Sequence, residues 1–356
     1  MEDFATLNFD ISPTGSSRLN QVDFENLAFG QVFSDHMFVM DYENGEWQRG
    51  EISSFGPMTF SPAMMSLHYG QAIFEGMKAF KQDDGGVSLF RPGSNISRFN
   101  FSARRMNMPE VPEETFFQAL VELVKLDRGW VPGFENSALY IRPFMFATEA
   151  HVGVRPAQSY RFCIFTCPVG AYYSRAVRVK VEQHFTRAAH GGTGAAKAAG
   201  NYAGSLYPTE LAKSEGYDQI LWTDASTHEH VEECGTMNVA FVIDGKLVVP
   251  QTSDTVLSGV TRSSAIHLAE HQGLVVEQRR VKVSELADAA KEGRLTEAFG
   301  LGTAATVSPI CTLGLPHMTW DLPDFSTWTV APMIKRELDN VRYGRGEDVF
   351  GWNIPE

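Results

Sequence analysis

Residues 190–205 read HGGTGAAKAAGNYAGS, a stretch in which one lysine, Lys197, stands among glycines and alanines. The stretch lacks the Gly-Lys-Ser/Thr order of a Walker phosphate loop, because Lys197 lies between Ala196 and Ala198. A lysine without bulky neighbours leaves room for a flat ring, and desolvation favours the neutral amine that attacks a carbonyl. Lys197 is therefore a candidate Schiff-base lysine. A flexible, solvated loop with an incidental lysine is the alternative that this segment alone leaves open.

A run of charged residues follows in HEHVEECGTMN, at 228–238. His228 and His230 alternate with Glu229, so we predict that they share one strand face, without a third ligand at a spacing typical of a metal site. A charged strand edge is the favoured interpretation. Glu233 precedes Cys-Gly-Thr and an apolar strand, so its carboxylate is predicted where the chain turns inward. There it could pair with a protonated ring nitrogen.

Two glycine turns are candidate anion sites. In LSGVTRSS, at 257–264, a helix is predicted to begin at about Thr261, and the N–H groups of a first helical turn bind anions. Ordinary helix capping is the alternative. FGLGTAAT, at 299–306, matches GxGxxA and suggests a nicotinamide site, although no long βαβ unit follows. A turn at Thr303 that offers N–H groups to a phosphate or carboxylate is the other interpretation.

The first half of the chain also contains aromatic residues that could line a pocket. They are Phe29, Tyr69, Phe74, Tyr140 and Tyr172. Each of them, taken alone, is more often part of a core. Arg98 and Arg142 stand in apolar surroundings, so each needs an anionic partner if it is buried.

The composition is that of a globular protein of 356 residues, 43% hydrophobic and 21% charged. A net charge of −13 without a block of Lys and Arg argues against nucleic acid and anionic membranes as partners. No apolar run approaches the ~20 residues of a membrane span, and MEDFATLNFD lacks the features of a signal peptide, so we expect a cytoplasmic location. No CxxC pair occurs, and Cys163 and Cys167 would lie roughly 13 Å apart on a strand, so we expect reduced core thiols.

Strand-like runs and helical periodicity alternate irregularly along the chain. Strands are predicted at 37–42, 88–91, 138–143, 161–168, 175–183, 218–224, 238–243 and 246–250, the last two joined by a hairpin turn at Asp244-Gly245. Helices are predicted at 261–270, 284–291 and 327–343, and after Pro112, where Phe117, Leu120, Val121 and Val124 repeat at helical spacing. This pattern predicts an α/β chain of mixed, α+β character, with mixed, largely antiparallel sheets and flanking helices. We expect a small domain at 1–171, an interdomain loop at 172–177 and a large domain at 178–356.

The motifs resemble, in their order, those of the branched-chain aminotransferases, which are two-domain pyridoxal 5'-phosphate (PLP) enzymes of fold type IV. The resemblance runs through FGQVFSDHM at 29–37, LHYGQAIFEGMKAF at 67–80, LFRPGSNISRFNFSARRM at 89–106, LYIRPF at 139–144 and CPVGAYY at 167–173. It continues through AAKAAGNYAGSL at 195–206, EECGTMNVAF at 232–241, LSGVTRSS at 257–264 and FGLGTAATVSP at 299–309.

The resemblance implies a role for each of these positions. Lys197 would form the Schiff base with PLP, while Tyr202 and Glu233 would bind the phenolic oxygen and the pyridine nitrogen of the cofactor. Further cofactor contacts, mostly to the phosphate, would come from Arg98, Thr236, Val260, Thr261 and Thr303. The substrate would meet Thr303, Ala304 and an aromatic wall, and Arg142 would receive the distal carboxylate of glutamate. That wall would consist of Phe29, Tyr69, Phe74, Tyr140 and Tyr172, and HVGV at 151–154, ending in Val154, would help to close it in a homodimer.

The implied reaction is transamination of L-leucine, L-isoleucine and L-valine with 2-oxoglutarate. A D-amino-acid aminotransferase or an aminodeoxychorismate lyase of the same fold type would share Lys197 and Glu233. From another class, a nicotinamide-dependent dehydrogenase or a non-catalytic phosphate-binding protein could use the glycine turns. Mammalian members of the family carry a CxxC after the Thr-Ala pair, but this chain has Ala-Thr-Val-Ser at 305–308, so we expect no thiol control there.

Overall fold

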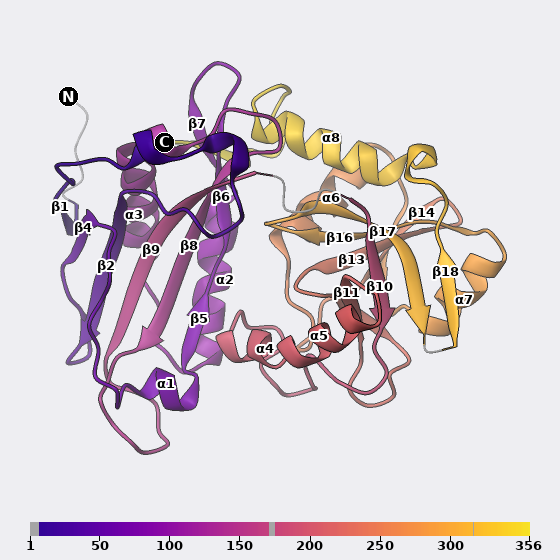
Figure 1. Ribbon diagram of the computed structural model, residues 1–356, viewed down its shortest axis with the longest axis horizontal. Helices are drawn as coiled ribbons and strands as arrows, with labels where there is room; N and C mark the ends of the chain where they lie inside the picture. Colours follow the sequence, from indigo (N-terminus) through magenta and orange to yellow (C-terminus); the bar gives the residue numbers. More distant parts are fainter. Residues whose placement is uncertain (1–6, 171–174, 316) are drawn as a thin grey trace. The chain divides into compact units, whose positions relative to one another are not determined.

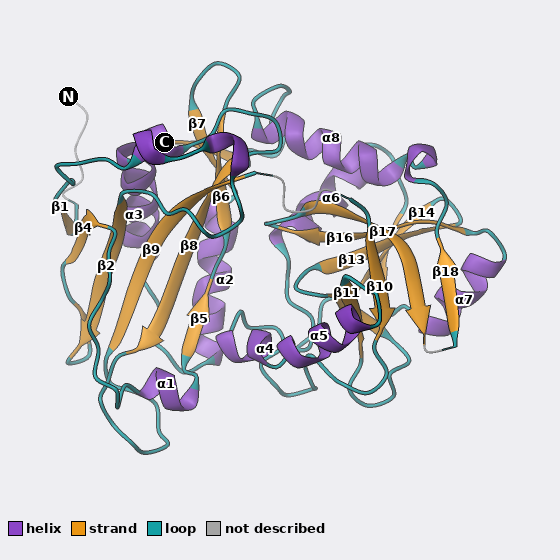
Figure 2. Ribbon diagram, in the orientation of Figure 1, coloured by secondary structure: helices purple, strands orange, loops and turns teal. Residues whose placement is uncertain are grey.

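The computed structural model describes residues 7–170, 175–315 and 317–356 (Figure 1). The chain forms two compact units, each built on a β-sheet with helices beside it (Figure 2). Unit 1 comprises Met1–Tyr172, Ala196–Ala199 and Val341–Glu356, and unit 2 comprises Tyr173–Ala195 and Gly200–Asn340. Lys197 therefore belongs to unit 1. The division of the chain expected from the sequence, with a loop at 172–177, stays a prediction.

Unit 1 contains a ten-stranded sheet in its described part, in the order β1-β4-β2-β9-β8-β6-β7-β19, with β3 paired to β2 and β5 to β8. The pair β1–β4 is parallel and the other pairs are antiparallel. The strands are β1 (Phe9–Ile11), β2 (His36–Glu43), β3 (Glu46–Trp47), β4 (Gly50–Ser54), β5 (Ala72–Phe74), β6 (Met77–Lys81), β7 (Val87–Phe90), β8 (Ala138–Ala147), β9 (Tyr160–Val169) and β19 (Asn353–Pro355).

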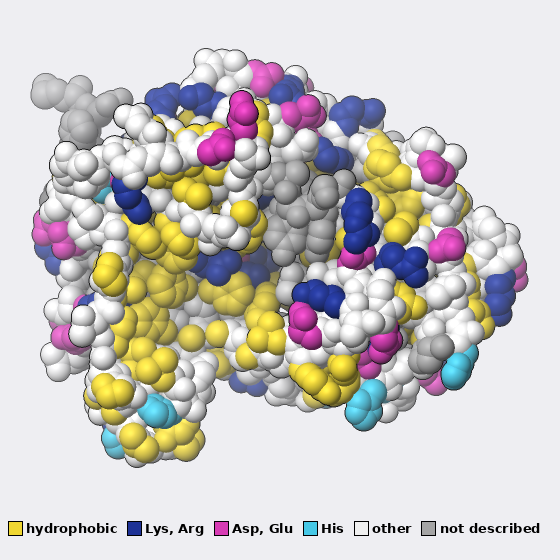
Figure 3. All heavy atoms as spheres, viewed as in Figure 1, with side chains coloured by type: hydrophobic (Ala, Val, Ile, Leu, Met, Phe, Trp, Pro, Cys, Tyr) yellow, Lys and Arg dark blue, Asp and Glu magenta, His cyan; other side chains and the backbone are white. Residues whose placement is uncertain are grey.

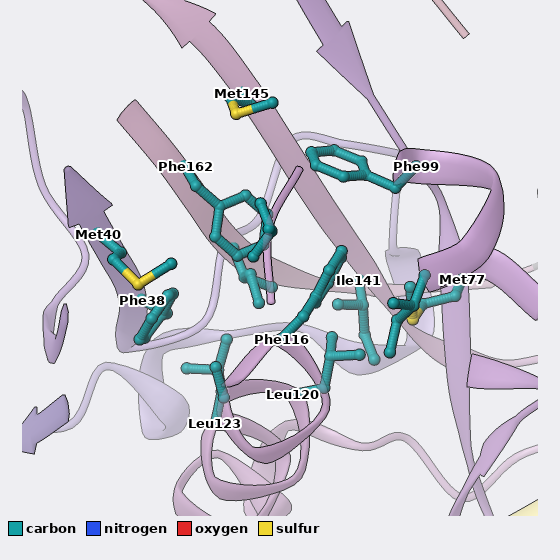
Figure 4. Close-up of a cluster of buried hydrophobic side chains, with 14 of the residues drawn as sticks. Phe38, Met40, Met77, Phe99, Phe116, Leu120, Leu123, Ile141, Met145 and Phe162 are labelled. Carbon is teal, nitrogen blue, oxygen red and sulfur yellow. The ribbon is translucent and has the colours of Figure 1, made fainter. Parts of the chain in front are cut away.

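Two long helices, α2 (Pro92–Arg105) and α3 (Glu113–Leu126), bury their apolar faces in the core of unit 1. Figure 4 shows Phe99 and Phe116 of these helices meeting Phe162 of β9, and the rings of Phe116 and Phe162 lie 4.7 Å apart. The helix predicted after Pro112 is confirmed as α3, with Phe117 and Val121 packed against the core. Phe116 is buried and Phe117 only half-buried, because the helix turns the first of the two adjacent phenylalanines toward the sheet.

Unit 2 contains a nine-stranded sheet in its described part, in the order β12-β11-β10-β17-β16-β13-β14-β15, with β18 paired to β17. Strand β10 is parallel to β11 and β17, and β14 is parallel to β15, while the remaining pairs are antiparallel. The strands are β10 (Val177–Val181), β11 (Gln219–Thr223), β12 (Val231–Cys234), β13 (Asn238–Ile243), β14 (Lys246–Pro250), β15 (Val276–Arg279), β16 (Leu295–Gly302), β17 (Thr306–Leu315) and β18 (Met318–Asp321).

The other helices are shorter than α2 and α3. They are α1 (Met65–Tyr69), α4 (Ala199–Ala203), α5 (Leu206–Ser214), α6 (Val260–His271), α7 (Val283–Lys291) and α8 (Val330–Arg342), with 3₁₀ turns at Leu19–Gln21, Phe24–Asn26, Arg128–Trp130 and Phe325–Thr327. No helix in the described ranges is long and apolar enough to cross a membrane.

Local sequence explains a tight turn in unit 2. Asp244 and Gly245 join β13 to β14 with φ angles of 51° and 72°, so the hairpin predicted there is confirmed. Two residues with positive φ match the twist of a two-residue hairpin. The mixed, mainly antiparallel sheets with flanking helices also confirm the predicted fold class.

Candidate active site

Two hydrogen bonds hold the backbone of Lys197, one at its N–H group and one at its carbonyl oxygen. Its N–H donates to Ser102 Oγ at 2.9 Å, and its carbonyl oxygen accepts from the N–H of Phe74 at 3.1 Å. The next residue, Ala198, forms a β-bridge with Ile73 and is 2% exposed. The lysine is therefore fixed against β5 and α2, which does not fit a flexible, solvated loop.

The Lys197 side chain lies beside an aromatic cluster in unit 1. Its Nζ is 4.7 Å from the centre of the Phe74 ring, and the guanidinium of Arg142 lies 4.8 Å from the same ring. Arg142 Nη2 donates to Tyr140 Oη at 2.9 Å, and the Phe29 ring is 5.1 Å from that of Tyr140. Arg142 Nε is buried and has no hydrogen-bond partner among the described residues. Cations favour the faces of aromatic rings, so this cluster combines apolar walls with one strong donor.

Two of the other predicted wall residues are exposed, and the third cannot be placed. Tyr69, at the end of α1, is 39% exposed, and Val154 is 88% exposed. Tyr172 lies outside the described residues. Their roles stay predictions.

Arg98 of α2 is buried against a carboxylate that the sequence analysis missed, Glu75. Arg98 Nε donates to Glu75 Oε2 at 2.8 Å and Nη2 donates to Oε1 at 2.5 Å, with Glu75 fully buried. Burial raises the pKa of Glu75, but the charge and hydrogen bonds of Arg98 and the charge of Lys197 outweigh it, so the pKa lies below its ordinary value. Glu75 is thus ionised and is the anionic partner that a buried Arg98 needs.

In unit 2, Glu233 lies on β12 and is 3% exposed. Its Oε1 accepts from the N–H of Leu257 at 2.6 Å, and Arg187 Nε lies 3.3 Å from Oε2. Arg187 Nη2 donates to the carbonyls of Gly194, at 3.1 Å, and Thr255. Arg187, which the sequence analysis did not single out, therefore links the glycine-rich loop to the Glu233 carboxylate.

The interpretation of residues 228–234 was partly wrong. His228 has a φ of 54° in a turn and its Nδ1 shares a hydrogen bond with Thr223 Oγ1, 2.8 Å away, so it does not share a strand face with His230. Strand β12 does lie at the edge of its sheet, as predicted, but all four of its residues are buried, including Glu232 and Glu233. No group of three or more His, Cys, Asp or Glu side chains among the described residues could hold a metal ion.

Helix α6 begins shortly after Leu257, the residue whose N–H binds Glu233. Its N-cap is Gly259, which offers no side-chain cap, and Val260 and Thr261 of the first turn are 8% and 4% exposed. A Cβ on Gly259 would lie 1.9 Å from Asn238 Oδ1, so only glycine allows this close approach. Asn238 Nδ2 in turn donates to the carbonyl of Leu257 at 2.9 Å. The Leu257 peptide thus joins Glu233 to the start of a helix, and the free N–H groups of a first helical turn are suited to bind an anion.

Thr303 and Ala304 occupy the turn between β16 and β17, where Gly302 pairs with Thr306. This antiparallel hairpin rules out the nicotinamide interpretation of GxGxxA, which requires a strand followed by a helix. Thr236 is exposed in the turn from β12 to β13, and Tyr202 is half-buried in α4. The structure places these residues in unit 2, and their contacts with a ligand stay predictions.

The four cysteines are the remaining potentially reactive side chains. All four are free thiols. Burial raises the pKa of Cys163 and Cys234 to about 12 and that of Cys167 to about 11, so these three remain protonated. The prediction of reduced core thiols is confirmed for them, while Cys311 is half-buried.

The chain is similar in sequence and structure to aminotransferases. The family model "amino-transferase class IV" matches residues 72–313. Branched-chain-amino-acid transaminase 1 of Bacillus subtilis is 44% identical over 337 residues, covering 93% of this chain and 95% of that protein. The branched-chain-amino-acid aminotransferase of Mycolicibacterium smegmatis is 40% identical, covering 92% and 91%.

Solved structures share the fold. The branched-chain aminotransferase of Thermoproteus uzoniensis with norvaline has a TM-score of 0.74 and 25% identity, covering 90% of this chain and 99% of that one. The branched-chain amino acid aminotransferase of Thermobaculum terrenum in its PLP form has a TM-score of 0.73 and 23% identity, covering 91% and 99%. This chain belongs to the class IV aminotransferases and, among them, to the branched-chain-amino-acid aminotransferases.

Proposed function

We propose that this protein is a PLP-dependent aminotransferase that moves the amino group of L-leucine, L-isoleucine or L-valine to 2-oxoglutarate. The observation that carries the proposal is the Phe74 ring, which has Lys197 Nζ 4.7 Å from its centre and the Arg142 guanidinium 4.8 Å from it. An amine thus lies beside an apolar surface that also carries a strong anion donor, Arg142. Family membership and this local chemistry agree.

The residues present fit PLP by the chemistry of their donors and acceptors. The buried carboxylate of Glu233 suits the protonated pyridine nitrogen, and Tyr202 suits the phenolic oxygen. The phosphate would be held by the start of α6, by Thr303 and by Arg98, whose side chain is 9% exposed, with Thr236 near the ring. When bound, PLP withdraws electrons from the amino acid and makes its Cα–H acidic.

The protein's own groups then have separate tasks. Lys197 binds the cofactor, and its Nζ removes the proton from the substrate Cα and holds it for return. Its fixed peptide groups place that amine, since Ser102 and Phe74 hold the backbone from opposite sides. Glu233 keeps the proton on the pyridine nitrogen. The turn at Thr303 and Ala304 offers N–H groups to the substrate carboxylate.

The aromatic cluster sets the choice of substrate. Phe29, Phe74 and Tyr140 form apolar walls for a branched side chain, and Arg142 Nε, buried without a described partner, suits the distal carboxylate of glutamate. One pocket can thus receive both amino donor and acceptor. Because a methylene group in an apolar pocket changes binding by only about 1–3 kcal/mol, we expect leucine, isoleucine and valine all to react.

A panel of amino donors with 2-oxoglutarate tests this proposal. We expect glutamate to form with L-leucine, L-isoleucine and L-valine and at most slowly with D-alanine. Turnover of D-alanine without turnover of L-leucine would instead identify a D-amino-acid aminotransferase. Release of pyruvate from aminodeoxychorismate would identify the lyase of the same fold type. A non-catalytic phosphate-binding protein would turn over none of them.

The proposal includes a homodimer, which an exposed apolar surface on unit 1 supports. Helix α1 and the loop beside it are joined by the bridge Met64–Ala150, and they expose Leu67 by 66%, Val152 by 71% and Val154 by 88%. Figure 3 shows hydrophobic side chains gathered around this part, at the lower left of the view. Patches of this kind mark protein contacts. Sedimentation of the wild type and of Val154→Asp tests it, and we expect the variant to weaken the dimer. A cytoplasmic location, tested by cell fractionation, completes the proposal.

A further inference from the structure

Glu75 is a fully buried carboxylate to which the proposed reaction gives no task. It follows β5 directly, and its N–H donates to the carbonyl of Pro143 at 2.7 Å. Its Oε1 also accepts from the N–H of Gly76 at 2.7 Å. Gly76 cannot carry a side chain, because a Cβ would lie 2.1 Å from Tyr140 Oη. The carboxylate is thus held by backbone that is itself closely packed.

This fixed carboxylate sets the orientation of Arg98. The pair forms a two-bond fork that uses Nε and Nη2 of the guanidinium, at 2.8 and 2.5 Å. A planar guanidinium held along one edge cannot rotate, so the direction of its third nitrogen, Nη1, is fixed as well. Without such a partner the arginine side chain would be mobile, and fixing it when an anion binds would cost conformational entropy.

The same helix also fixes Lys197. Ser102 lies one turn after Arg98 on α2, and its Oγ donates to the Arg98 carbonyl at 3.0 Å while accepting the Lys197 N–H at 2.9 Å. On the other side, the Lys197 carbonyl accepts from Phe74, the residue before Glu75. Arg98 and Lys197 are therefore attached to one rigid frame of β5 and α2.

We propose that Glu75 is a positioning residue, which fixes the Arg98 guanidinium as a phosphate anchor at a set place relative to Lys197. The inference rests on the proposed function, because it takes PLP as the ligand. Glu75 binds neither cofactor nor substrate in this scheme and acts through Arg98.

Cofactor binding by the apo-protein tests the inference without any measurement of turnover. Equilibrium titration followed by absorbance gives dissociation constants for PLP and for pyridoxal, which lacks the phosphate. We expect Glu75→Gln and Glu75→Asp to weaken PLP binding by about tenfold or more, since ~1.4 kcal/mol of lost anchoring corresponds to tenfold. Glu75→Asp retains the charge but is one methylene shorter, so it tests the geometry of the fork. Pyridoxal binding should change by less than about twofold in both variants.

The matched control is Asp41→Asn, which removes another two-bond fork in unit 1. Arg161 Nε and Nη2 donate to Asp41 at 2.7 Å each, but that pair is only half-buried and joins β2 to β9. We expect both dissociation constants of this variant to equal those of the wild type. Near-ultraviolet circular dichroism of each apo-variant reports whether it is folded.

A second comparison holds even if Glu75→Gln alone does not fold. Arg98→Gln and the double variant Glu75→Gln/Arg98→Gln should bind PLP equally, because Glu75 acts only through Arg98. Equal losses for PLP and pyridoxal, unchanged PLP binding in both Glu75 variants, or a further loss in the double variant would overturn the inference. A wild-type protein that does not bind PLP would overturn the proposed function instead.

Discussion

Each unit buries a glutamate beside an arginine, and the two pairs are built differently. In unit 1 the Arg98 guanidinium gives two hydrogen bonds to Glu75 along one edge. In unit 2, Arg187 Nε lies 3.3 Å from Glu233 Oε2. Arg187 Nη2 donates to the carbonyls of Gly194 and Thr255. Glu233 takes its short bond, 2.6 Å, from the Leu257 peptide.

The difference separates two uses of a buried carboxylate. An ionised carboxylate accepts about four hydrogen bonds. Glu75 receives two from one guanidinium and one from Gly76, so it serves to hold an arginine in place. Glu233 is fixed by backbone and supported by a nearby cation, which is suited to a carboxylate that must also accept a bond from a ligand. The following substitutions test this distinction, from the largest expected effect to the smallest.

Removing Lys197 should have the largest effect. We expect Lys197→Ala to lower kcat by roughly 10⁴-fold or more, because the variant loses both the covalent attachment of the cofactor and the amine that moves the proton. The measurement is the rate of glutamate formation from L-leucine and 2-oxoglutarate. Turnover at the wild-type rate would show that the reactive amine lies elsewhere.

Neutralising Glu233 should have the next largest effect on turnover. Glu233→Gln retains the shape of the side chain but cannot keep the pyridine nitrogen protonated, so we expect kcat to fall by roughly 10²–10³-fold. If Glu233 only stabilised the fold, kcat would change little and the thermal stability of the apo-protein would fall instead. Steady-state kinetics and apo-protein melting curves, measured together, separate the two uses.

The Glu75 pair should contribute more to folding than a half-buried pair of the same geometry. Glu75→Gln leaves Arg98 buried without a counter-charge, so we expect the free energy of unfolding to fall by about 3–5 kcal/mol. Asp41→Asn, in the half-buried fork with Arg161, should lower it by at most ~1 kcal/mol. Urea unfolding of the apo-proteins checks this, and equal losses in the two variants would contradict the distinction.

The smallest expected effect is on how the free energy of unfolding depends on pH. Glu75 and Glu232 should change this dependence in opposite directions. Glu75 has a lowered pKa, so its contribution is present above the ordinary value of 4.5 and is lost as pH falls through the lowered value. Glu232 has a pKa raised by burial, only partly offset by Thr255 Oγ1 at 2.5 Å. Its contribution is present below 4.5 and is lost as pH rises through the raised value.

Urea unfolding between about pH 4 and pH 8 measures this difference. The free energy of unfolding of Glu232→Gln, relative to that of the wild type, should increase as pH rises. The variant removes a carboxylate whose Oε2 has no hydrogen-bond partner among the described residues. Glu75→Gln should be unfavourable by a nearly constant amount above the ordinary value of 4.5 and less unfavourable as pH falls below it. Parallel pH profiles for the two variants would show that burial alone governs both groups.

The sequence predicted the elements whose signals are local, and missed those that depend on partners distant in the chain. The Asp244-Gly245 hairpin and the isolation of Lys197 among small residues could be read directly. Glu75 could not be assigned, because its partner Arg98 lies 23 residues away, on a different element. An acidic residue inside the apolar run AIFEGMKAF was a usable signal, since a buried carboxylate needs a partner.

Other details were missed where two local patterns were equally good. Phe116 and Phe117 both fit the helical period, and only the sheet decides which one is buried. His228 and His230 alternate as strand residues do, but the turn that closes on Asp224 takes them out of the strand. The sequence did not distinguish Arg187 from an ordinary arginine in a loop, because only the structure shows that it lies beside Glu233.

The most direct test of the central claim is to locate the lysine that holds the cofactor. The wild-type holoenzyme is reduced with borohydride, digested with protease and analysed by mass spectrometry. We expect the pyridoxyl group on the peptide that contains Lys197, whose backbone is fixed between Ser102 and Phe74. Modification of another lysine, such as Lys78, which is 7% exposed, with Lys197 unmodified, would contradict the assignment.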